Sequence, residues 1–490
     1  MRAQIPSTPG FEGRPTYLGV DDRSAEGDRR LKRLGGFEAM LLYSETRNLM
    51  QHTMKIGVLD ASECDVAFTP DLFRDRLARR LHLLDPFRYQ LVDIPFRIHR
   101  PMWVENVDVD LDYHVRRYSI NPPGGPRELD AAIADIASTP LDRQRPLWEF
   151  HLVEGLADNK VAIVGKIHHV LADGVASANL LALALDEQAM IEGEANLVPV
   201  NPPPSGPELV KAAVRDHARQ LVGVPDLLRY TADGIRSVRR NRRIVPGLAR
   251  TFGAPVTFLN HTVAPTRSFA SATLPLADVK LTSKVLGGTI NDLVLAIATG
   301  ALRALLIKYD GSATEPLLAL VPRSLNNSPE RIFGNDFATM IVSLPVHVGD
   351  PVERMRLARA GAAIAKSNHE ALGPDIVNRW ADYIPAFLAR PVLQRLSTRE
   401  SHNRMANVSI SNVPGPRERG TVIGAPLEQI YSVGPLTPGS GINITVWSYV
   451  DQLSISVIED GVTVEDPHVI TDAMLHEFRV LRRAAGLEDS

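Results

Sequence analysis

The chain has 490 residues, too many for one compact hydrophobic core, so we expect two domains. Hydrophobic residues make up 44% and charged residues 23%, as in an ordinary globular protein, and the net charge of -3 argues against a general polyanion-binding surface. Cys64 is the single cysteine, which excludes an intramolecular disulfide framework and favours an intracellular setting.

We expect no secretory signal at the start of this sequence. Its first thirty residues are polar and lack the apolar stretch of a secretory signal, so we expect residues 1–33 to form a flexible arm. A membrane-spanning helix needs about 20 consecutive apolar residues, and we expect none in this chain. Any contact with a membrane is therefore expected to be peripheral.

Apolar periodicity predicts an α/β protein. Expected helices are 71–84, 128–138, 175–188, 279–286, 290–308, 351–369 and 472–485, and expected strands are 161–170, 316–322, 337–348, 405–412 and 442–458. The proline-rich run 201–207 predicts a linker, and 208–250 predicts one or two basic helices. We expect an N-terminal domain at 34–200, a basic helical linker at 201–265 and a C-terminal domain at 266–490.

The run 166–174 (KIHHVLADG) places two adjacent histidines at the end of a β-rich apolar segment. Successive side chains on a strand point to opposite faces, so one imidazole can enter a cavity while the other stays in the supporting wall. His169 shares a face with Ile167, and His168 shares one with Lys166. Histidine suits proton abstraction near neutral pH, so this strand end is a candidate catalytic position.

Two alternatives to catalysis stay open for the same residues, a structural role and a metal site. Neighbouring histidines on a strand are more often structural than catalytic. His169 and Asp173 could instead approach a metal ion, but zinc needs at least three protein ligands and no third His or Cys spacing supports a metal site.

Further motifs accompany the histidines along the chain. In order, these are 101–105 (PMWVE), 110–117 (DLDYHVRR), 140–149 (PLDRQRPLWE), the histidine motif, 291–292 (ND), 321–325 (VPRSL), 334–335 (GN), 344–345 (LP) and 411–416 (SNVPGP). The combination resembles the bacterial wax ester synthase/diacylglycerol acyltransferase family, within the chloramphenicol acetyltransferase-like superfamily. The resemblance runs from about residue 34 to the C-terminus.

The resemblance implies two chloramphenicol acetyltransferase-like α/β sandwich domains with an active-site tunnel between them. It also implies transfer of a long-chain fatty acyl group from acyl-CoA, a co-substrate, to diacylglycerol or a long-chain alcohol, without an acyl-enzyme or cofactor. His169 is then the general base and His168 its support. Asp173 is expected to organise the motif by accepting backbone hydrogen bonds or pairing with an arginine, and Gly174 to allow a close approach or a positive φ.

Four residues further along are candidates for substrate contacts. Asn291 is either a hydrogen-bond donor to the thioester oxyanion or a helix N-cap, and the two roles need not exclude each other. Asp292 is expected to stabilise the helix start or to pair with a distant arginine. Ser411 and Asn412 could line the tunnel, although a plain turn explains them nearly as well. The charged 140–149 segment is expected to be a wall held by salt bridges.

The implied substrates are lipids, so we expect a cytoplasmic protein associated peripherally with the inner membrane face or with lipid droplets, and no nucleic-acid partner. Residues 236–250 and 378–390 are candidate membrane-contact segments, the alternatives being a solvated face and a core-packing helix. Residues 34–40 (LGGFEAM) depart from the Pro-Leu-Ser-Pro-x-Asp-like stretch of many relatives. Rival functions are an acyltransferase that uses a carrier-protein thioester and a non-catalytic lipid-droplet scaffold.

Overall fold

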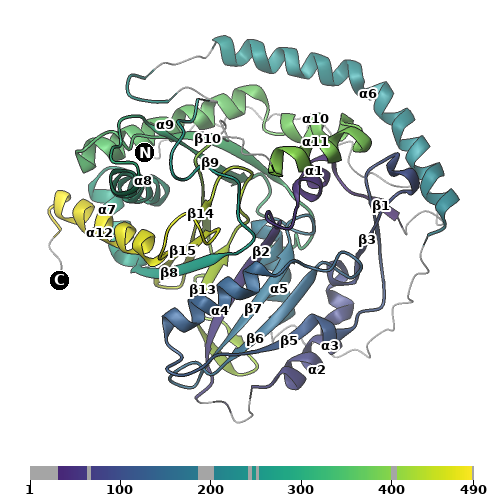
Figure 1. Cartoon of the computed structure of the whole chain (residues 1–490), viewed down its shortest axis with the longest axis horizontal. Helices are drawn as coiled ribbons and strands as arrows, with labels where there is room; N and C mark the ends of the chain where they lie inside the picture. The colour runs from purple at the N-terminus through teal and green to yellow at the C-terminus, as the bar shows by residue number, and fades with distance from the viewer. Residues whose placement is uncertain are drawn as a thin grey trace, which may run out of the picture.

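A computed structural model describes residues 31–62, 64, 68–185, 204–240, 245–249, 253–398 and 406–487. The expected arm at 1–33 lies outside the described residues except for its last three, which form β1 (Leu31–Arg33). Two six-stranded sheets, each flanked by helices, make up the α/β fold that the sequence predicts (Figure 1).

The first sheet has the strand order β12-β13-β2-β7-β6-β5. Its strands are β12 (Thr421–Val422), β13 (Ala425–Val433), β2 (His52–Asp60), β7 (Lys160–His168), β6 (Trp148–Glu154) and β5 (Val115–Ser119). Alternate residues of β7 enter different cores: Ile163 and Ile167 join one cluster, and Ala162 and Val164 join another. Helices α2 (Pro70–Arg80) and α5 (Gly174–Leu185) cover the first face, and α4 (Pro126–Ser138) covers the second.

The second sheet has the strand order β10-β9-β11-β14-β15-β8. Its strands are β10 (Phe337–Leu344), β9 (Leu317–Ser324), β11 (Val408–Pro414), β14 (Ile442–Tyr449), β15 (Gln452–Glu459) and β8 (Ser268–Pro275). Its helices are α7 (Leu276–Val285), α8 (Ile290–Tyr309), α9 (Pro351–Leu372) and α12 (His468–Ala484). Together they enclose the largest apolar core.

The C-terminal half supplies chain segments to the N-terminal half. Strand β13 pairs antiparallel with β2, with Tyr431 opposite Ile56, although β13 lies within the predicted C-terminal domain at 266–490. Gly334, also within that domain, forms a parallel bridge with Ala172 at the histidine motif. Segments of the C-terminal half therefore complete the structure around the end of β7.

The expectation that no segment is long and apolar enough to span a membrane is wrong for one helix. Helix α8 is 20 residues long and, by length and composition alone, apolar enough to cross a membrane. Its most apolar window is 72% buried inside the fold, packed against α9 and α12. Length and apolarity suit a core helix as well as a membrane span, and burial within the protein identifies α8 as a core helix.

The remaining elements surround the first sheet and the upper edge of the molecule (Figure 1). They include α1 (Gly36–Ser44), β3 (Gln90–Val92), β4 (Met102–Val104), α3 (Leu111–His114), α6 (Gly206–Arg240), α10 (Ile376–Tyr383) and α11 (Ala386–Thr398), with short 3-10 helices Leu81–Leu83, Asp85–Arg88 and Pro95–Arg97 (η3). The basic segment at 208–250 is one continuous helix, α6, as far as Arg240; residues 241–244 and 250 lie outside the described residues.

Candidate active site

The two histidines lie at the C-terminal end of β7. His168 is the last residue of the strand, opposite His52 of β2. Its side chain is 1% exposed and therefore belongs to the supporting wall. His169 follows the strand in a turn and is half-buried. Only His169 has part of its ring available to a reactant.

A carboxylate and an arginine support His168. Its Nε2 lies 3.2 Å from Oε1 of Glu45, and its Nδ1 accepts a hydrogen bond from the Val170 N–H at 3.2 Å. Because Nδ1 accepts, the ring proton belongs on Nε2, which donates to Glu45. Arg143 donates its Nε to the other oxygen of Glu45 at 2.8 Å. This relay of hydrogen bonds orients the strand end that carries His169.

The pKa of Glu45 shows how strongly this carboxylate is held. Burial by itself raises the pKa of Glu45, but the neighbouring His168 and Arg143 outweigh burial and lower it to about 2. Glu45 therefore stays ionised at any physiological pH and remains bound to both His168 and Arg143.

His169 contacts two residues from the second half of the chain. Its ring lies edge-on to the Phe337 ring, with centroids 5.5 Å apart. Asn335 donates its Nδ2 to the backbone carbonyl of His169 at 2.9 Å. Nδ1 of His169 and Oδ1 of Asn335 are both buried without a hydrogen-bond partner among the described atoms. Because Nδ1 is enclosed while the residue is half-buried, we infer that the open side of the ring carries Nε2.

Burial lowers the pKa of His169 below its ordinary value of 6.5. The charge of Asp173 and hydrogen bonding within the motif act in the opposite direction but offset only part of this effect. The imidazole is therefore neutral near pH 7, which is the protonation state that a general base requires.

Asp173 makes both kinds of contact that the sequence analysis expected of it. Its Oδ1 accepts the N–H groups of Val175 and Ala176, each at 3.0 Å, and its Oδ2 accepts that of Asp336 at 2.9 Å. Arg331 donates Nη2 to Oδ1 at 2.8 Å, and the side chains are 3% and 10% exposed for Asp173 and Arg331. Burial tends to raise the pKa of Asp173, but these donors outweigh burial and lower it. This permanently charged carboxylate joins the motif to the β9–β10 connection.

Gly174 differs from expectation. It is the first residue of α5, has no positive φ, and a Cβ built there would meet nothing within 4 Å. Neither backbone strain nor a close contact within the protein therefore explains the glycine. The open space beside it is consistent with the substrate-binding role that the sequence analysis predicts, and that role stays a prediction.

Asn291 and Asp292 lie at the start of α8. The N-cap is Thr289, not Asn291: Thr289 Oγ1 accepts the Asp292 N–H at 3.2 Å, and Asp292 Oδ2 accepts the Thr289 N–H at 2.9 Å. Asp292 also lies 3.9 Å from the Arg359 guanidinium, so it has both of its expected roles. Within the part of the chain that the structure describes, no contact joins Asn291 to His169. Its role as oxyanion donor stays a prediction.

Ser411 and Asn412 are half-buried on β11, where they pair in register with Thr445 and Val446 of the parallel strand β14. On its other side β11 pairs with β9 only through Val408 and Ser409. Ser411 and Asn412 are therefore strand residues rather than turn residues, next to a place where two strands separate. Their contact with substrate stays a prediction, as does the tunnel.

The 140–149 segment is held by ion pairs, as expected. Arg143 pairs with Glu45, and Arg145 lies 2.9 Å from Asp110. The Trp148 indole donates to the Phe87 carbonyl at 2.9 Å and is fully buried. These contacts hold the segment in place next to Glu45, the partner of His168.

Three residues of the site had no predicted role: Glu45, Arg331 and Asn335. Asn335 stands in one of the quoted motifs, but sequence spacing does not connect it to His169, 166 residues away. Arg331 and Glu45 lie 158 and 123 residues from their partners. The sequence offered one hint, because a buried Asp173 requires a positively charged partner somewhere in the chain.

Among the described residues, no group of three or more His, Cys, Asp or Glu side chains is arranged to hold a metal ion.

Two family profiles match this chain. The wax ester synthase/diacylglycerol acyltransferase catalytic domain matches residues 34–294, and the C-terminal domain of the same family matches residues 333–482. The chain belongs to this family. It is therefore an enzyme of the O-acyltransferase class, and the resemblance seen in its motifs is confirmed.

Named relatives agree with this assignment. A Mycobacterium tuberculosis protein with the provisional name diacylglycerol O-acyltransferase is 52% identical over 459 residues, covering 93% of this chain and 97% of the relative. An O-acyltransferase of Acinetobacter baylyi is 30% identical over 403 residues, covering 80% of this chain and 84% of the relative.

Solved structures agree in fold. The wax ester synthase/diacylglycerol acyltransferase of Marinobacter aquaeolei superposes with a TM-score of 0.65 at 26% identity, covering 93% of this chain and all of that one. The first condensation domain of the CDA synthetase has a TM-score of 0.55 at 14% identity over 92% of this chain and 94% of that one. The second likeness shows the fold alone. Together they confirm the chloramphenicol acetyltransferase-like fold of two α/β domains.

Proposed function

We propose that this enzyme transfers a long-chain fatty acyl group from acyl-CoA to the hydroxyl of diacylglycerol, of a long-chain alcohol, or of both. The observation that carries the proposal is His169: a half-buried imidazole with an enclosed Nδ1 and a lowered pKa, at the point where the two halves of the fold meet. The names of the relatives support the substrate class.

In the proposed reaction, His169 Nε2 removes the proton of the alcohol as its oxygen attacks the thioester carbonyl carbon. The carbon–oxygen bond forms, and the carbonyl electrons move onto the oxygen to give a tetrahedral oxyanion. The oxyanion then collapses, the carbon–sulfur bond breaks, and the thiolate of coenzyme A receives the proton from His169. The products are the ester and free coenzyme A, and the imidazole is neutral again without an acyl-enzyme or a cofactor.

The neighbours of His169 have supporting roles in this scheme. Asn335 holds the backbone of His169, and its unpaired Oδ1 is a suitable acceptor for the Nδ1–H that the imidazole carries while Nε2 acts as the base. The Asp173–Arg331 pair positions the motif. We further propose that the enzyme is cytoplasmic and works at the inner membrane face or on lipid droplets, where its acceptor is dissolved.

The experiment is an assay of the purified full-length protein with long-chain acyl-CoA and either diacylglycerol or hexadecanol. We expect His169→Ala to lower kcat by about 100-fold or more, the usual contribution of a general base. His347→Ala is a matched control, because His347 is also half-buried with an enclosed, unpaired Nδ1. An unchanged rate in His169→Ala would overturn the mechanism. Transfer only from an acyl-carrier protein would overturn the acyl-CoA donor, and ester formation by neither donor would leave the scaffold alternative.

A further inference from the structure

One face of the molecule exposes an unusual number of large apolar side chains. Of the exposed large apolar residues that the structure describes, more than half lie on α6, α10, α11 or the link between α10 and α11. We call this surface the α6–α11 face; its apolar members are Val214, Leu221, Val222, Leu228, Ile235, Val377, Trp380, Ile384, Phe387, Leu388, Val392 and Leu396. Large exposed apolar side chains gathered on neighbouring helices often mark a surface with a function.

The apolar residues of α6 form a regular stripe. Val214, Leu221, Leu228 and Ile235 follow one another at intervals of seven residues, which places them along one side of the helix. All four are exposed, and Leu221 is 75% exposed. The stripe runs from Val214 to Ile235 within this 35-residue helix, and an apolar stripe that faces solvent over this distance indicates a flat apolar partner.

Contacts between helices make the α6 stripe continuous with α10. The Trp380 indole donates Nε1 to the Thr231 hydroxyl at 2.9 Å. Thr231 lies three residues after Leu228 and four before Ile235, so these side chains share one helix face. In Figure 1, α6 runs along the outer edge of the molecule, with α10 and α11 on its inner side.

Phe96 extends the same surface near the N-terminal half of α6. It is 92% exposed, and its φ of 56° lies in the left-handed region that bulky residues avoid. The η3 turn that carries it contacts α6, since the His217 ring Nε2 lies 2.9 Å from the Ile98 carbonyl. Exposure of a phenylalanine on a strained turn costs stability, and insertion into a nonpolar phase would offset that cost.

The charge of these helices has the sign that anionic lipid requires. α6 carries seven basic and four acidic residues, and α11 carries two arginines and no acidic residue, in a chain whose net charge is -3. Basic residues beside exposed apolar ones are typical of helices that lie in the interface of a membrane with anionic headgroups.

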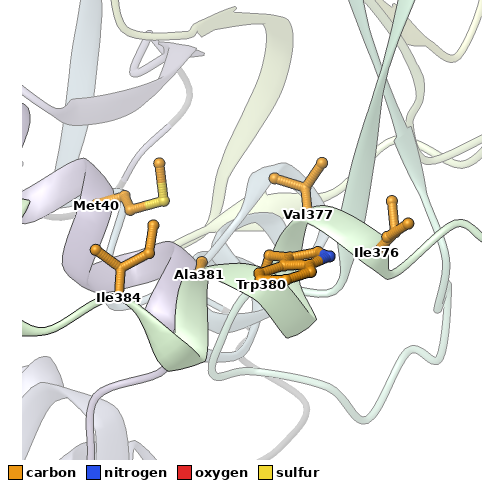
Figure 2. Close-up of a pocket in the computed structure, with 6 residues that line it drawn as sticks. All are labelled: Met40, Ile376, Val377, Trp380, Ala381 and Ile384. Atoms are coloured by element: carbon orange, nitrogen blue, oxygen red, sulfur yellow. The ribbon is translucent and has the colours of Figure 1, made fainter. Parts of the chain in front are cut away.

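The α6–α11 face also leads toward His169. A pocket of about 300 Å³ is open to solvent between α1 and α10, and it is lined by Met40, Ile376, Val377, Trp380, Ala381 and Ile384 (Figure 2). Phe37 lies three residues before Met40 on α1, and its ring is edge-on to Phe337 at 5.2 Å between centroids. Phe337 contacts the His169 ring. One short helix, α1, therefore separates the pocket from the residues around the catalytic imidazole.

We propose that the α6–α11 face, with Phe96, is the surface on which this enzyme docks onto a lipid bilayer that contains anionic phospholipid. Docking places the pocket between α1 and α10 against the lipid phase, where an alcohol with long acyl chains can enter toward His169. This inference rests on the proposed function for the identity of the lipid that enters, whereas docking itself can be measured without any activity.

The test is flotation of the full-length protein with vesicles of phosphatidylcholine alone and of phosphatidylcholine mixed with phosphatidylglycerol. Wild-type protein is expected to float with the mixed vesicles and to detach at high salt. The double variant Leu221→Asp/Phe387→Asp is expected to bind the mixed vesicles about 100-fold more weakly, because two large apolar anchors become charged. Val462→Asp is the matched control: Val462 is 63% exposed, as Phe387 is at 61%, but lies outside this face.

Activity assays with soluble and with membrane-embedded substrates separate membrane docking from the chemical step. With a water-soluble short-chain alcohol and a short acyl-CoA, the double variant is expected to keep the wild-type rate, whereas with vesicle-embedded diacylglycerol its rate is expected to fall with its binding. Flotation of the double variant equal to that of wild type would overturn the proposal. So would a change from dimer to monomer in gel filtration without a change in flotation, because a second copy would then cover this face. If no alcohol is acylated by wild-type protein, the proposed function fails while flotation still decides the docking surface.

Discussion

The Asp173–Arg331 pair offers the most direct test of how the two halves hold the histidine motif. Arg331→Met removes the guanidinium but keeps much of the side chain's length and apolar stem. Breaking a buried ion pair by removing one partner usually costs about 3–5 kcal/mol. Three backbone N–H groups still hold the Asp173 carboxylate, so we expect the free energy of unfolding to fall by about 3 kcal/mol, at the lower end of that range.

Urea unfolding followed by circular dichroism measures this loss, and a double-mutant cycle with Asp173→Asn isolates the pair. If the two side chains stabilise each other, the double variant should lose about 1–2 kcal/mol less than the two single losses added together. Arg359→Met is the control, because Arg359 is 57% exposed and lies 3.9 Å from Asp292, so its removal should cost at most about 0.5 kcal/mol.

Two results would refute this reasoning. One is a loss in Arg331→Met no larger than that of Arg359→Met. The other is strict additivity in the double variant, which would mean that the two side chains act separately. If the pair positions the motif, kcat should also fall in Arg331→Met, but by less than in His169→Ala, because the general base is still present.

Two further predictions concern protonation. Because burial lowers the pKa of His169, the imidazole stays neutral as the pH falls below 6.5. In a pH profile of kcat/KM, we therefore expect the half-maximal value on the acid side at a pH below 6.5. A midpoint above 6.5 would contradict the assigned environment of His169. The pKa of Glu45 is lowered to about 2 from 4.5, so its contribution to stability is complete above pH 4.5 and is lost as the pH falls toward 2. Glu45→Gln should therefore reduce the free energy of unfolding by about 2 kcal/mol at pH 7, with the difference from wild type shrinking below pH 4.5; a pH-independent difference would show that charge is not the cause.

Much of the fold and the position of the base follow from local sequence patterns. The predicted helices lie close to observed ones, because apolar periodicity reports which side of an element is buried. The expected strand 442–458 is two antiparallel strands, β14 and β15, and strands β2 and β13 were not predicted. Strand alternation predicts opposite directions for His168 and His169, and this stays a prediction because β7 ends at His168 and His169 lies in the following turn. The motifs in their order also identified the family.

Ambiguity arose where one local pattern suits two environments. The run 290–309 is as apolar as a membrane span, and only its burial between α9 and α12 identifies it as a core helix. Similarly, both Thr289 and Asn291 are good N-cap residues, and the choice depends on where the helix begins.

By itself, the amino-acid sequence determined the family and much of the element pattern, and it singled out the imidazole that we propose as the base. The tertiary structure alone decided what holds that imidazole: Glu45 behind His168, Arg331 on Asp173, Asn335 on the His169 backbone, and β13 in the sheet of the other half. The physical reason is separation along the chain. Local patterns arise from neighbours within a few residues, whereas these partners lie more than a hundred residues apart and meet only in the folded tertiary structure.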